Sequence, residues 1–356
     1  MIIERNSGQK ELWRSQKIYR ANAFPRNEIG SEFWDVPTIS QQNSLFSEST
    51  QWFLSGRSAL KAIIKELGEA RSVSLPSWCC DSMIKPFVDA HYSINFYPVY
   101  FERGLVQEVD LNADVLFVMD YFGYTGTIPD LSNYKGTVIR DITHSLFSST
   151  YSDADYYFGS LRKWCGVWTG GYLCTGDRHK LEIKDGDDQG YTGLRQKAMA
   201  EKAEYIRGTR EDKGYLEIFD KAEDALEHVG IVRAAYRDVE MLKRLDVKEI
   251  KNWRKANAEV LRTAFPDWLI FPYLLPTDTP MFVPILVPDG KRDVLRRHLI
   301  ENDIYCPVHW PVSEYHRLDE RTAHIYQNEL SLVCDQRYTE NDMYRMVETI
   351  RAYMEE

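Results

Sequence analysis

Short apolar runs alternate with helix-forming stretches between residues 72 and 142, and this alternation constrains the fold more than any other feature of the chain. The runs are SVSLP (72–76), SINFYPVYF (93–101), VLFVMDYF (115–122) and TVIRDI (137–142). Apolar strands that alternate with helices imply a mostly parallel sheet covered on both faces. Such a sheet binds its ligands at the carboxyl ends of its strands. The sequence therefore predicts an α/β fold and indicates where the chemistry should lie.

The 356-residue length predicts about two domains. Residues 1–50 lack sustained periodicity, and we expect them to form an extended N-terminal arm. Residues 51–245 contain the alternating runs and are predicted to be the large domain. Residues 246–356 have the pattern of a smaller α+β domain, with strands at 282–288 and 304–308.

Several helix boundaries can be predicted from local signals. The spacing of apolar residues predicts a helix from Ser58 to near Gly68. The charged stretch 177–228 is mostly helical in pattern, with breaks expected at Gly193, Gly208 and Gly214. A final helix is expected to start at Thr339, with Asp342 completing an approximate capping box.

Composition excludes several classes of protein. The formal net charge of −10 and a pI near 5.4 argue against nucleic-acid binding. We find neither a signal peptide nor a run of about 18 apolar residues, so no membrane span is expected. The six cysteines and eight histidines show no metal-ligand spacing. We therefore expect a cytoplasmic protein with reduced thiols and no structural metal.

Asp141 and Lys163 are candidate catalytic residues. Asp141 ends the predicted strand TVIRDI, His144 follows it closely, and Lys163 lies in GSLRKW. A pyridoxal-phosphate (PLP) site needs a lysine amine and a carboxylate that keeps the pyridine nitrogen protonated. It also needs a phosphate cradle and a flat group against the ring. Taken singly, a strand-end carboxylate and a surface lysine are the commoner interpretations, and it is their joint placement that favours a site.

The remaining parts of such a site also have candidates. LSGRSAL (54–60) leads a glycine turn into a helix, so Ser58 and the backbone N–H groups there suit a phosphate. A plain N-cap serine explains the same pattern equally well. Trp78 is a candidate aromatic platform, with a core tryptophan as the alternative. Ser160 offers a second hydroxyl, and Gly170-Gly171 permits a close backbone approach.

Five segments in order resemble the DegT/DnrJ/StrS aminotransferases. The segments are FLSGRSALKAII, DYFG (120–123), IRDITHS, GSLRKW with GGYLCTGD, and the C-terminal pieces IENDIYCPVHWP and LSLVCDQRYTENDMYRM. The resemblance runs from about residue 50 to the end. It implies the aspartate-aminotransferase fold (fold type I), with a seven-stranded, mostly parallel sheet in the large domain.

The resemblance also implies roles for individual residues. Lys163 matches the lysine that holds PLP as a Schiff base, and Asp141 matches the acid that pairs with the pyridine nitrogen. His144 matches a residue on the ring-hydroxyl side of the cofactor. The other matches are Ser58 and Ala59 to phosphate-binding residues of a G-[TS]-x-A-L turn, Trp78 or Cys80 to the ring-stacking residue, and His309 to a histidine of the substrate pocket.

Two departures from the family pattern concern the phosphate site. Many members have an asparagine in G-Y-N-Y-R-[ML] that reaches the partner subunit's phosphate, whereas this chain has VGIVRAAYRD (229–238). The usual serine five residues before the lysine is Phe158 here, so Ser160 is expected to replace it. Neither departure affects Lys163 or Asp141.

The resemblance implies transfer of an amino group from an amino acid, expected to be glutamate, to a keto group of a nucleotide-linked sugar. It also implies a homodimer. Two alternatives stay open from the sequence: a fold type I PLP enzyme with a non-sugar substrate, and a non-catalytic binding or regulatory relative. The intact Lys163, Asp141 and GRSAL turn argue against the second.

Overall fold

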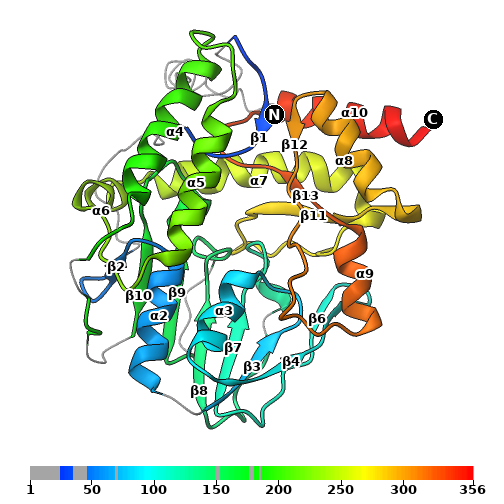
Figure 1. Ribbon diagram of the computed structural model, residues 1–356. Helices are drawn as coiled ribbons and strands as arrows, with labels where there is room; N and C mark the ends of the chain where they lie inside the picture. The colour runs from blue at the N-terminus through cyan, green and yellow to red at the C-terminus, as the bar shows by residue number, and fades with distance from the viewer. Residues whose placement is uncertain are drawn as a thin grey trace, which may run out of the picture.

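A seven-stranded sheet occupies the lower half of the molecule in the view of Figure 1. The computed structural model describes residues 25–34, 46–68, 71–127, 129–148, 153–175, 180–183 and 186–355. In pairing order the strands are β2 (Gln51–Phe53), β10 (Gly171–Cys174), β9 (Tyr156–Ser160), β8 (Thr137–Asp141), β7 (Val115–Met119), β3 (Ser72–Pro76) and β4 (Ser93–Tyr97). Neighbouring strands are parallel except at β10, which runs antiparallel to both β9 and β2. The predicted mostly parallel sheet is confirmed.

The predicted strand over 93–101 divides at Pro98. Proline has no N–H to donate to a ladder, so it interrupts strand pairing. The chain after it forms β5 (Val99–Phe101), which leaves the main sheet and pairs with β6 (Leu105–Gln107) in a hairpin. The predicted strand over 137–142 ends at Asp141, which places this carboxylate at the carboxyl end of an inner strand of the sheet.

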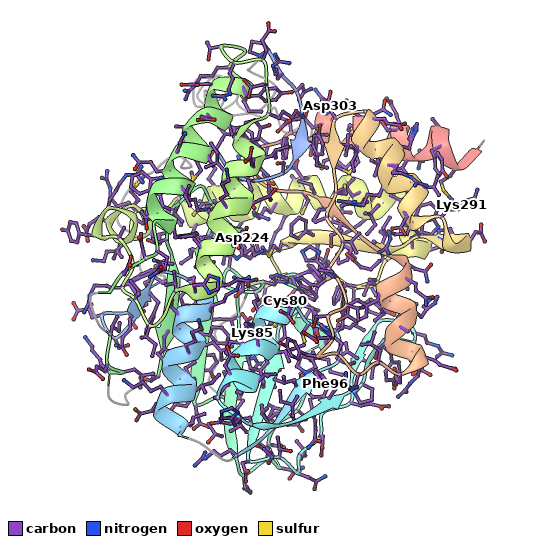
Figure 2. The ribbon with its side chains drawn as sticks, viewed as in Figure 1. Cys80, Lys85, Phe96, Asp224, Lys291 and Asp303 are labelled. Carbon is purple, nitrogen blue, oxygen red and sulfur yellow. The ribbon has the colours of Figure 1, made fainter. Side chains whose placement is uncertain are left out.

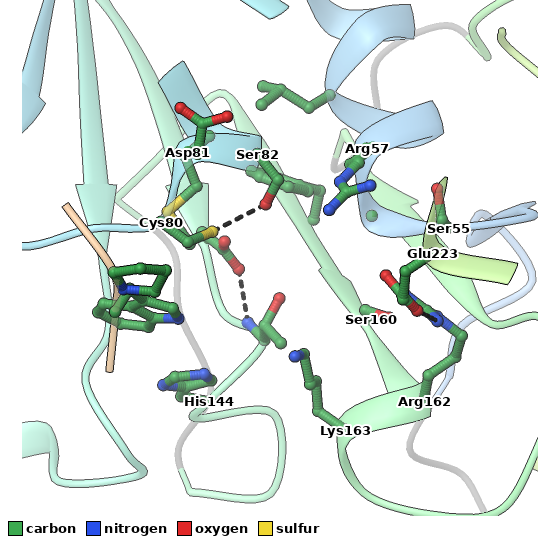
Figure 3. Close-up of a pocket in the computed structure, with 18 residues that line it drawn as sticks. Ser55, Arg57, Cys80, Asp81, Ser82, His144, Ser160, Arg162, Lys163 and Glu223 are labelled. Atoms are coloured by element: carbon green, nitrogen blue, oxygen red, sulfur yellow. Dashed lines mark hydrogen bonds and ion pairs between the residues drawn. The ribbon is translucent and has the colours of Figure 1, made fainter. Parts of the chain in front are cut away.

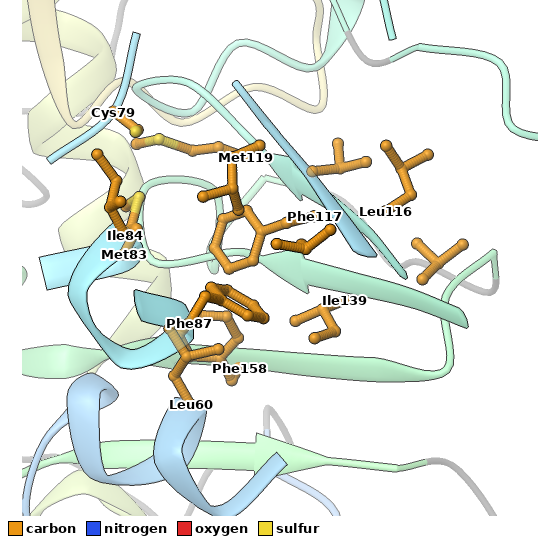
Figure 4. Packing of buried hydrophobic residues seen from close by; sticks show 14 of the residues in the cluster. Leu60, Cys79, Met83, Ile84, Phe87, Leu116, Phe117, Met119, Ile139 and Phe158 are labelled. Atoms are coloured by element: carbon orange, nitrogen blue, oxygen red, sulfur yellow. The ribbon is translucent and has the colours of Figure 1, made fainter. Parts of the chain in front are cut away.

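Helices α2 (Gly56–Leu67) and α3 (Asp81–Asp89) pack against the sheet (Figure 4). Leu60 of α2 and Phe87 of α3 are buried with Phe117 and Phe158 from the strands beneath them. The rings of Phe87 and Phe117 lie 6.0 Å apart at 90°. Burying a side chain of this size stabilises the fold by about 1.5–3 kcal/mol. This packing fixes the starts of α2 and α3 relative to the strand ends.

The helices that follow the sheet in sequence are α4 (Tyr191–Ile206), α5 (Tyr215–His228), α6 (Tyr236–Leu242), α7 (Val247–Ala264), α8 (Arg292–Glu301), α9 (Glu320–Asn328) and α10 (Glu340–Glu355). Gly208 and Gly214 lie between α4 and α5, as predicted. Gly193 lies inside α4, so the predicted break there is wrong. A single glycine costs a helix only about 1 kcal/mol, which the packing of α4 against α5 offsets.

Strands of the C-terminal half form two further short pairs outside the seven-stranded sheet. β11 (Phe282–Leu286) is antiparallel to β13 (Glu329–Val333). β12 (Ile304–Tyr305) pairs in parallel with β1 (Ile29–Gly30), so residues 25–34 of the predicted arm lie against the C-terminal half. Residues 1–24 and 35–45 of that arm lie outside the described residues.

The start of the final helix shows the predicted contact between Thr339 and Asp342. The carboxylate of Asp342 accepts hydrogen bonds of 2.8 Å from both the N–H and the hydroxyl of Thr339. The Asp342 side chain thus reaches back to the backbone N–H of Thr339, which is the contact that a capping box requires of its second residue.

A second core cluster lies in the C-terminal half and joins residues of α4 and α5 to residues of α7, α8 and α10. Its members thus come from both sides of the predicted boundary at residue 245. The domain limits at 50 and 245 therefore stay predictions.

Candidate active site

A cavity of about 310 Å³ opens at the carboxyl ends of β8 and β9, which is where a parallel sheet is expected to bind a ligand. Cys80 marks its place near the middle of the molecule in Figure 2, and Figure 3 shows it from close by. The lining residues are Ser55, Gly56, Arg57, Leu60, Cys80, Asp81, Ser82, Met83, Asp141, Thr143, His144, Phe158, Ser160, Arg162, Lys163, Glu223, Trp310 and Pro311. The structure thus brings four of the predicted site residues, Asp141, His144, Ser160 and Lys163, into one cavity.

Asp141 presents a buried carboxylate at the end of β8. One of its oxygens, Oδ1, accepts a hydrogen bond of 2.8 Å from the N–H of Thr143, two residues further on. Burial raises the pKa of Asp141 to about 6, and the Thr143 hydrogen bond opposes this rise. The carboxylate is therefore held in a place where a cationic partner would stabilise it strongly.

Lys163 follows β9 on the short helix η4 (Leu161–Lys163), and its amine points into the cavity (Figure 3). The next residue, Trp164, is fully buried and anchors this segment. Its indole N–H donates to the carbonyl of Thr143 at 2.5 Å. Because the N–H of Thr143 also donates to Asp141, these two hydrogen bonds connect the segment that carries Lys163 to the end of β8.

Two of the buried polar atoms in the cavity wall that have no hydrogen-bond partner among the described residues belong to predicted site residues. They are Nδ1 of His144 and the hydroxyl oxygen of Ser160. Burial lowers the pKa of His144 well below its usual range, and His309 and Lys163 lower it further, so the ring is neutral. Buried polar atoms in native proteins are nearly always paired, so both atoms point to a ligand with polar groups.

The start of α2 differs from the prediction. Ser55, rather than Ser58, is the N-cap, and its hydroxyl accepts from the N–H of Ser58 at 3.1 Å. The hydroxyl of Ser58 donates to the carbonyl of Gly230 at 2.7 Å, and the N–H of Ala59 donates to the carbonyl of Ser55. Ser58 and Ala59 are buried behind the wall, so their polar groups are already used.

Arg57 takes the position at the cavity that was expected of Ser58. It directly follows Gly56 and lines the cavity, and its buried Nη1 atom has no partner in the described part of the chain. Sequence reasoning missed it, although it occupies the [TS] position of the G-[TS]-x-A-L pattern. The N-terminus of a helix together with a guanidinium is well suited to a phosphate.

The close approach predicted at Gly170-Gly171 is present. A Cβ atom on Gly171 would lie 2.1 Å from the carbonyl oxygen of Ser55. Only glycine therefore lets β10 lie beside the start of α2.

Trp78 and Cys80 are the two candidates for the residue that lies against the ring, and the structure places only one of them at the cavity. Trp78 has no exposed surface, stacks on Tyr121 at 4.9 Å and donates its indole N–H to the carbonyl of His309. It belongs to the core behind the cavity. Cys80 lines the cavity instead, with its sulfur 2.8 Å from the hydroxyl of Ser82. Of the two alternatives left open by the sequence, Cys80 is the residue at the wall.

His309 lies one layer behind the cavity, while its neighbours Trp310 and Pro311 line it. Its ring is 5.9 Å from that of His144 and 5.1 Å from that of Trp310. Burial and the charge of Lys163 lower the pKa of His309 to about 3. This ring therefore stays neutral at physiological pH.

A charged pair that the sequence did not suggest closes another side of the cavity. Arg162 donates to Glu223 of α5 at 2.8 Å, and Arg195 lies 3.9 Å from the same carboxylate. Burial alone would raise the pKa of Glu223, but Arg162 lowers it to about 2. Nothing in the local sequence connects these residues, since α5 begins more than fifty positions after Arg162.

The part of the chain that the structure describes contains neither a candidate metal site nor a candidate membrane-spanning helix. No group of three or more His, Cys, Asp or Glu side chains there can hold a metal ion. No helix in the same residues is long and apolar enough to cross a membrane.

Comparison with known proteins gives a match in fold but not in sequence. No protein-family model and no curated protein matches the chain. Many solved structures do match. The aminotransferase TlmJ from Streptoalloteichus hindustanus has a TM-score of 0.60 at 17% identity, with 86% of each chain covered.

The aminotransferase PseC of pseudoaminic acid biosynthesis from Helicobacter pylori has a TM-score of 0.60 at 14% identity, over 91% of this chain and 100% of PseC. A DegT DnrJ EryC1 StrS aminotransferase from Brucella abortus has a TM-score of 0.56 at 12% identity, over 85% of each chain. The chain has the fold of the sugar aminotransferases. The fold that the resemblance implied is thereby confirmed. Other solved structures with this aminotransferase fold are described in PLP or PMP forms.

Proposed function

We propose that this chain is a PLP-dependent aminotransferase that moves an amino group from an amino acid to a keto group of a sugar, with Lys163 as its essential lysine. One observation carries the proposal: two segments, the end of β8 with Asp141 and His144 and the end of β9 with Ser160 and Lys163, line one cavity. The aminotransferase fold of the chain supports it.

The residues of the cavity fit PLP. The start of α2, the guanidinium of Arg57 and the unpartnered hydroxyl of Ser160 would hold the phosphate. Asp141 would hold the pyridine nitrogen, since its buried carboxylate favours a cationic partner. The unpartnered Nδ1 of His144 would take a polar substituent of the ring. Cys80 would lie against the ring in place of an aromatic residue.

When bound, PLP supplies an electron-withdrawing ring that stabilises negative charge at the carbon losing a proton. The residues of the chain then have separate tasks. Lys163 accepts the proton from the α-carbon of the amino donor and returns it on the acceptor side. Asp141 keeps the pyridine nitrogen protonated. A positioned base of this kind contributes about 10²–10⁴-fold to the rate.

The finer assignments rest on the sequence resemblance. We propose L-glutamate as the amino donor and a nucleotide-linked keto-deoxy sugar as the acceptor. We also propose a homodimer in the cytoplasm. A fold type I enzyme with a non-sugar substrate is the alternative, and a panel of keto acceptors offered to the amine form of the cofactor separates the two.

The visible absorbance of the protein with PLP tests the proposal. We expect wild type to show a yellow band that L-glutamate bleaches, because the lysine-bound aldehyde is converted to the amine form. Lys163→Ala should lack the lysine-dependent band and lose turnover. Lys197→Ala is the matched control, since Lys197 is an exposed lysine of α4 far from the lining residues in sequence.

Two results would contradict parts of the proposal. A wild-type protein that binds no PLP would exclude the whole function. If the protein binds PLP at Lys163 but no amino acid bleaches the band, the cofactor site is supported and transamination is excluded.

A further inference from the structure

Three side chains form a buried hydrogen-bonded chain behind the cavity, outside the residues that the proposed function uses. Glu329 and Ser331 on β13 have no exposed surface, and His309 is 7% exposed. Ser331 lies 2.6 Å from Oε1 of Glu329 and 2.9 Å from Nδ1 of His309. The second carboxylate oxygen, Oε2, accepts from the backbone N–H of His309 at 2.7 Å. Glu329 therefore contacts His309 twice, once directly and once through Ser331.

The hydrogen bonds that join Glu329, Ser331 and His309 can be donated in either of two directions, depending on which of the groups carry the protons. A backbone N–H can only donate, so Oε2 accepts from His309. The carbonyl oxygen of a carboxylic acid is the better acceptor, so a proton on Glu329 is favoured on Oε1, beside the hydroxyl of Ser331. If Glu329 is ionised, Ser331 donates to Oε1 and accepts from Nδ1–H of His309. If Glu329 carries a proton on Oε1, that proton is donated to Ser331, which then donates to an unprotonated Nδ1. A neutral imidazole has one N–H, so this second state places it on Nε2.

We infer that the protonation state of Glu329 sets the tautomer of His309 through Ser331. Glu329 is thus a positioning residue for His309, which lies one layer behind the cavity. In the ionised state, Nε2 of His309 is a hydrogen-bond acceptor. In the protonated state, Nε2 is a donor. Within the described residues, Nδ1 is the ring nitrogen of His309 that has a hydrogen-bond partner, so Nε2 is left to meet water or a ligand.

The electrostatic surroundings allow Glu329 to change state near neutral pH. Burial raises the pKa of Glu329 to about 8, and the hydrogen bonds from His309 and Ser331 oppose this rise. Arg292 of α8 also lowers it, and its guanidinium donates to the backbone carbonyl of Glu329 at 2.9 Å. On the paired strand β11, Glu329 faces the apolar Leu286.

His309 itself does not gain a charge in this range. Burial and Lys163 lower its pKa to about 3, and the neighbouring ring of His144 is also held neutral. A change near pH 8 at His309 would thus be a change of tautomer at constant ring charge. The consequence is a ring directly behind the cavity whose hydrogen-bonding character depends on a carboxyl group buried on β13.

Nuclear magnetic resonance of ¹⁵N-histidine-labelled protein tests the inference without cofactor. Long-range ¹H–¹⁵N spectra distinguish protonated from unprotonated ring nitrogens, and the signal lost in His309→Asn identifies His309. In wild type we expect the proton on Nε2 below about pH 8 and on Nδ1 above it. In Glu329→Gln the side-chain amide donates to Ser331 at every pH, so Nε2–H should persist throughout.

Two more variants complete the experiment. Ser331→Ala removes the link, so the tautomer of His309 should no longer follow pH near 8 even though Glu329 is present. Glu108→Gln is the control, because Glu108 is an exposed carboxylate paired with Arg321, and it should behave as wild type.

A wild-type tautomer that is independent of pH and identical in Glu329→Gln would overturn the inference. The inference does not rest on the proposed function, since it is tested in the protein alone. Failure to bind PLP would leave it standing, and failure of the tautomer switch would leave the cofactor site standing.

Discussion

Arg57 is the single residue that most changes the interpretation of the phosphate site. A guanidinium at the start of α2 would donate a charge-assisted hydrogen bond to a bound phosphate, and such a bond typically stabilises by about 1.5–3 kcal/mol. We expect Arg57→Ala to weaken PLP binding by about 10–100-fold. Titration of the apoprotein with PLP, followed by absorbance, measures this change.

Pyridoxal without its phosphate is the matched ligand for this variant. It should bind wild type and Arg57→Ala equally, because the guanidinium would have no anion to contact. Equal loss of affinity for both ligands would show that Arg57 supports the fold rather than the phosphate.

Asp141 also leads to a prediction at the residue scale. Its pKa is raised from 3.8 to about 6, so the folded apoprotein disfavours the ionised form. At about 1.4 kcal/mol per pKa unit, Asp141→Asn should stabilise the apoprotein at pH 8 by up to about 3 kcal/mol. This advantage should shrink as pH falls through about 6 and vanish below about 4, where Asp141 is protonated in both states. Urea unfolding at several pH values measures it.

The same variant should have the opposite effect on activity. An asparagine cannot keep the pyridine nitrogen protonated, so Asp141→Asn should lose at least about 10²-fold in turnover while retaining PLP. Turnover near the wild-type rate would exclude the assigned role of Asp141.

At the scale of elements, the DYFG turn after β7 depends on its glycine. Gly123 has a φ of +87°, and an added Cβ would lie 2.0 Å from the carbonyl oxygen of Thr279. The turn positions Asp120, which accepts from Arg140 at 3.0 Å and from Ser145 at 2.6 Å. A left-handed backbone costs a non-glycine residue about 1–2 kcal/mol, and the clash adds to this.

We therefore expect Gly123→Ala to lower the free energy of unfolding by more than about 2 kcal/mol. Gly126→Ala is the control, because the nearest atom to its Cβ is Leu275 Cδ1 at 3.8 Å. That control should change stability by less than about 0.5 kcal/mol. Similar stabilities for the two variants in chemical unfolding would contradict the role of the turn.

At the scale of the whole molecule, the proposed homodimer is open to direct measurement. Light scattering after size exclusion should give about twice the chain mass of 41.6 kDa. Two tyrosines, Tyr236 and Tyr273, are 79% and 80% exposed in the single chain. Large exposed aromatic side chains are typical of interfaces. A mass near 41.6 kDa across the micromolar range would exclude a stable dimer.

The sequence by itself determined the parallel sheet and placed two residues, Asp141 and Lys163, near the carboxyl ends of its strands. Apolar periodicity is local, and a strand such as 72–76 can be predicted because each residue depends mainly on its immediate neighbours. Asp141 could be placed at the site because the carboxyl ends of parallel strands share one edge. Lys163 required the resemblance as well, since a lone lysine carries no local signal.

Only the tertiary structure decided which neighbouring side chain faces the cavity. Arg57 and Ser58 are adjacent, and the start of α2 at Gly56 instead of Ser58 decides which of them faces the cavity. Trp78 and Cys80 are two positions apart, yet Trp78 is buried in the core and Cys80 lines the cavity. The hydrogen bonds that join Glu329, Ser331 and His309 could not be predicted from the sequence either, because the strand and the loop that carry these residues meet only in the folded protein. Side-chain direction depends on the packing of distant elements, and no local pattern in the sequence records it.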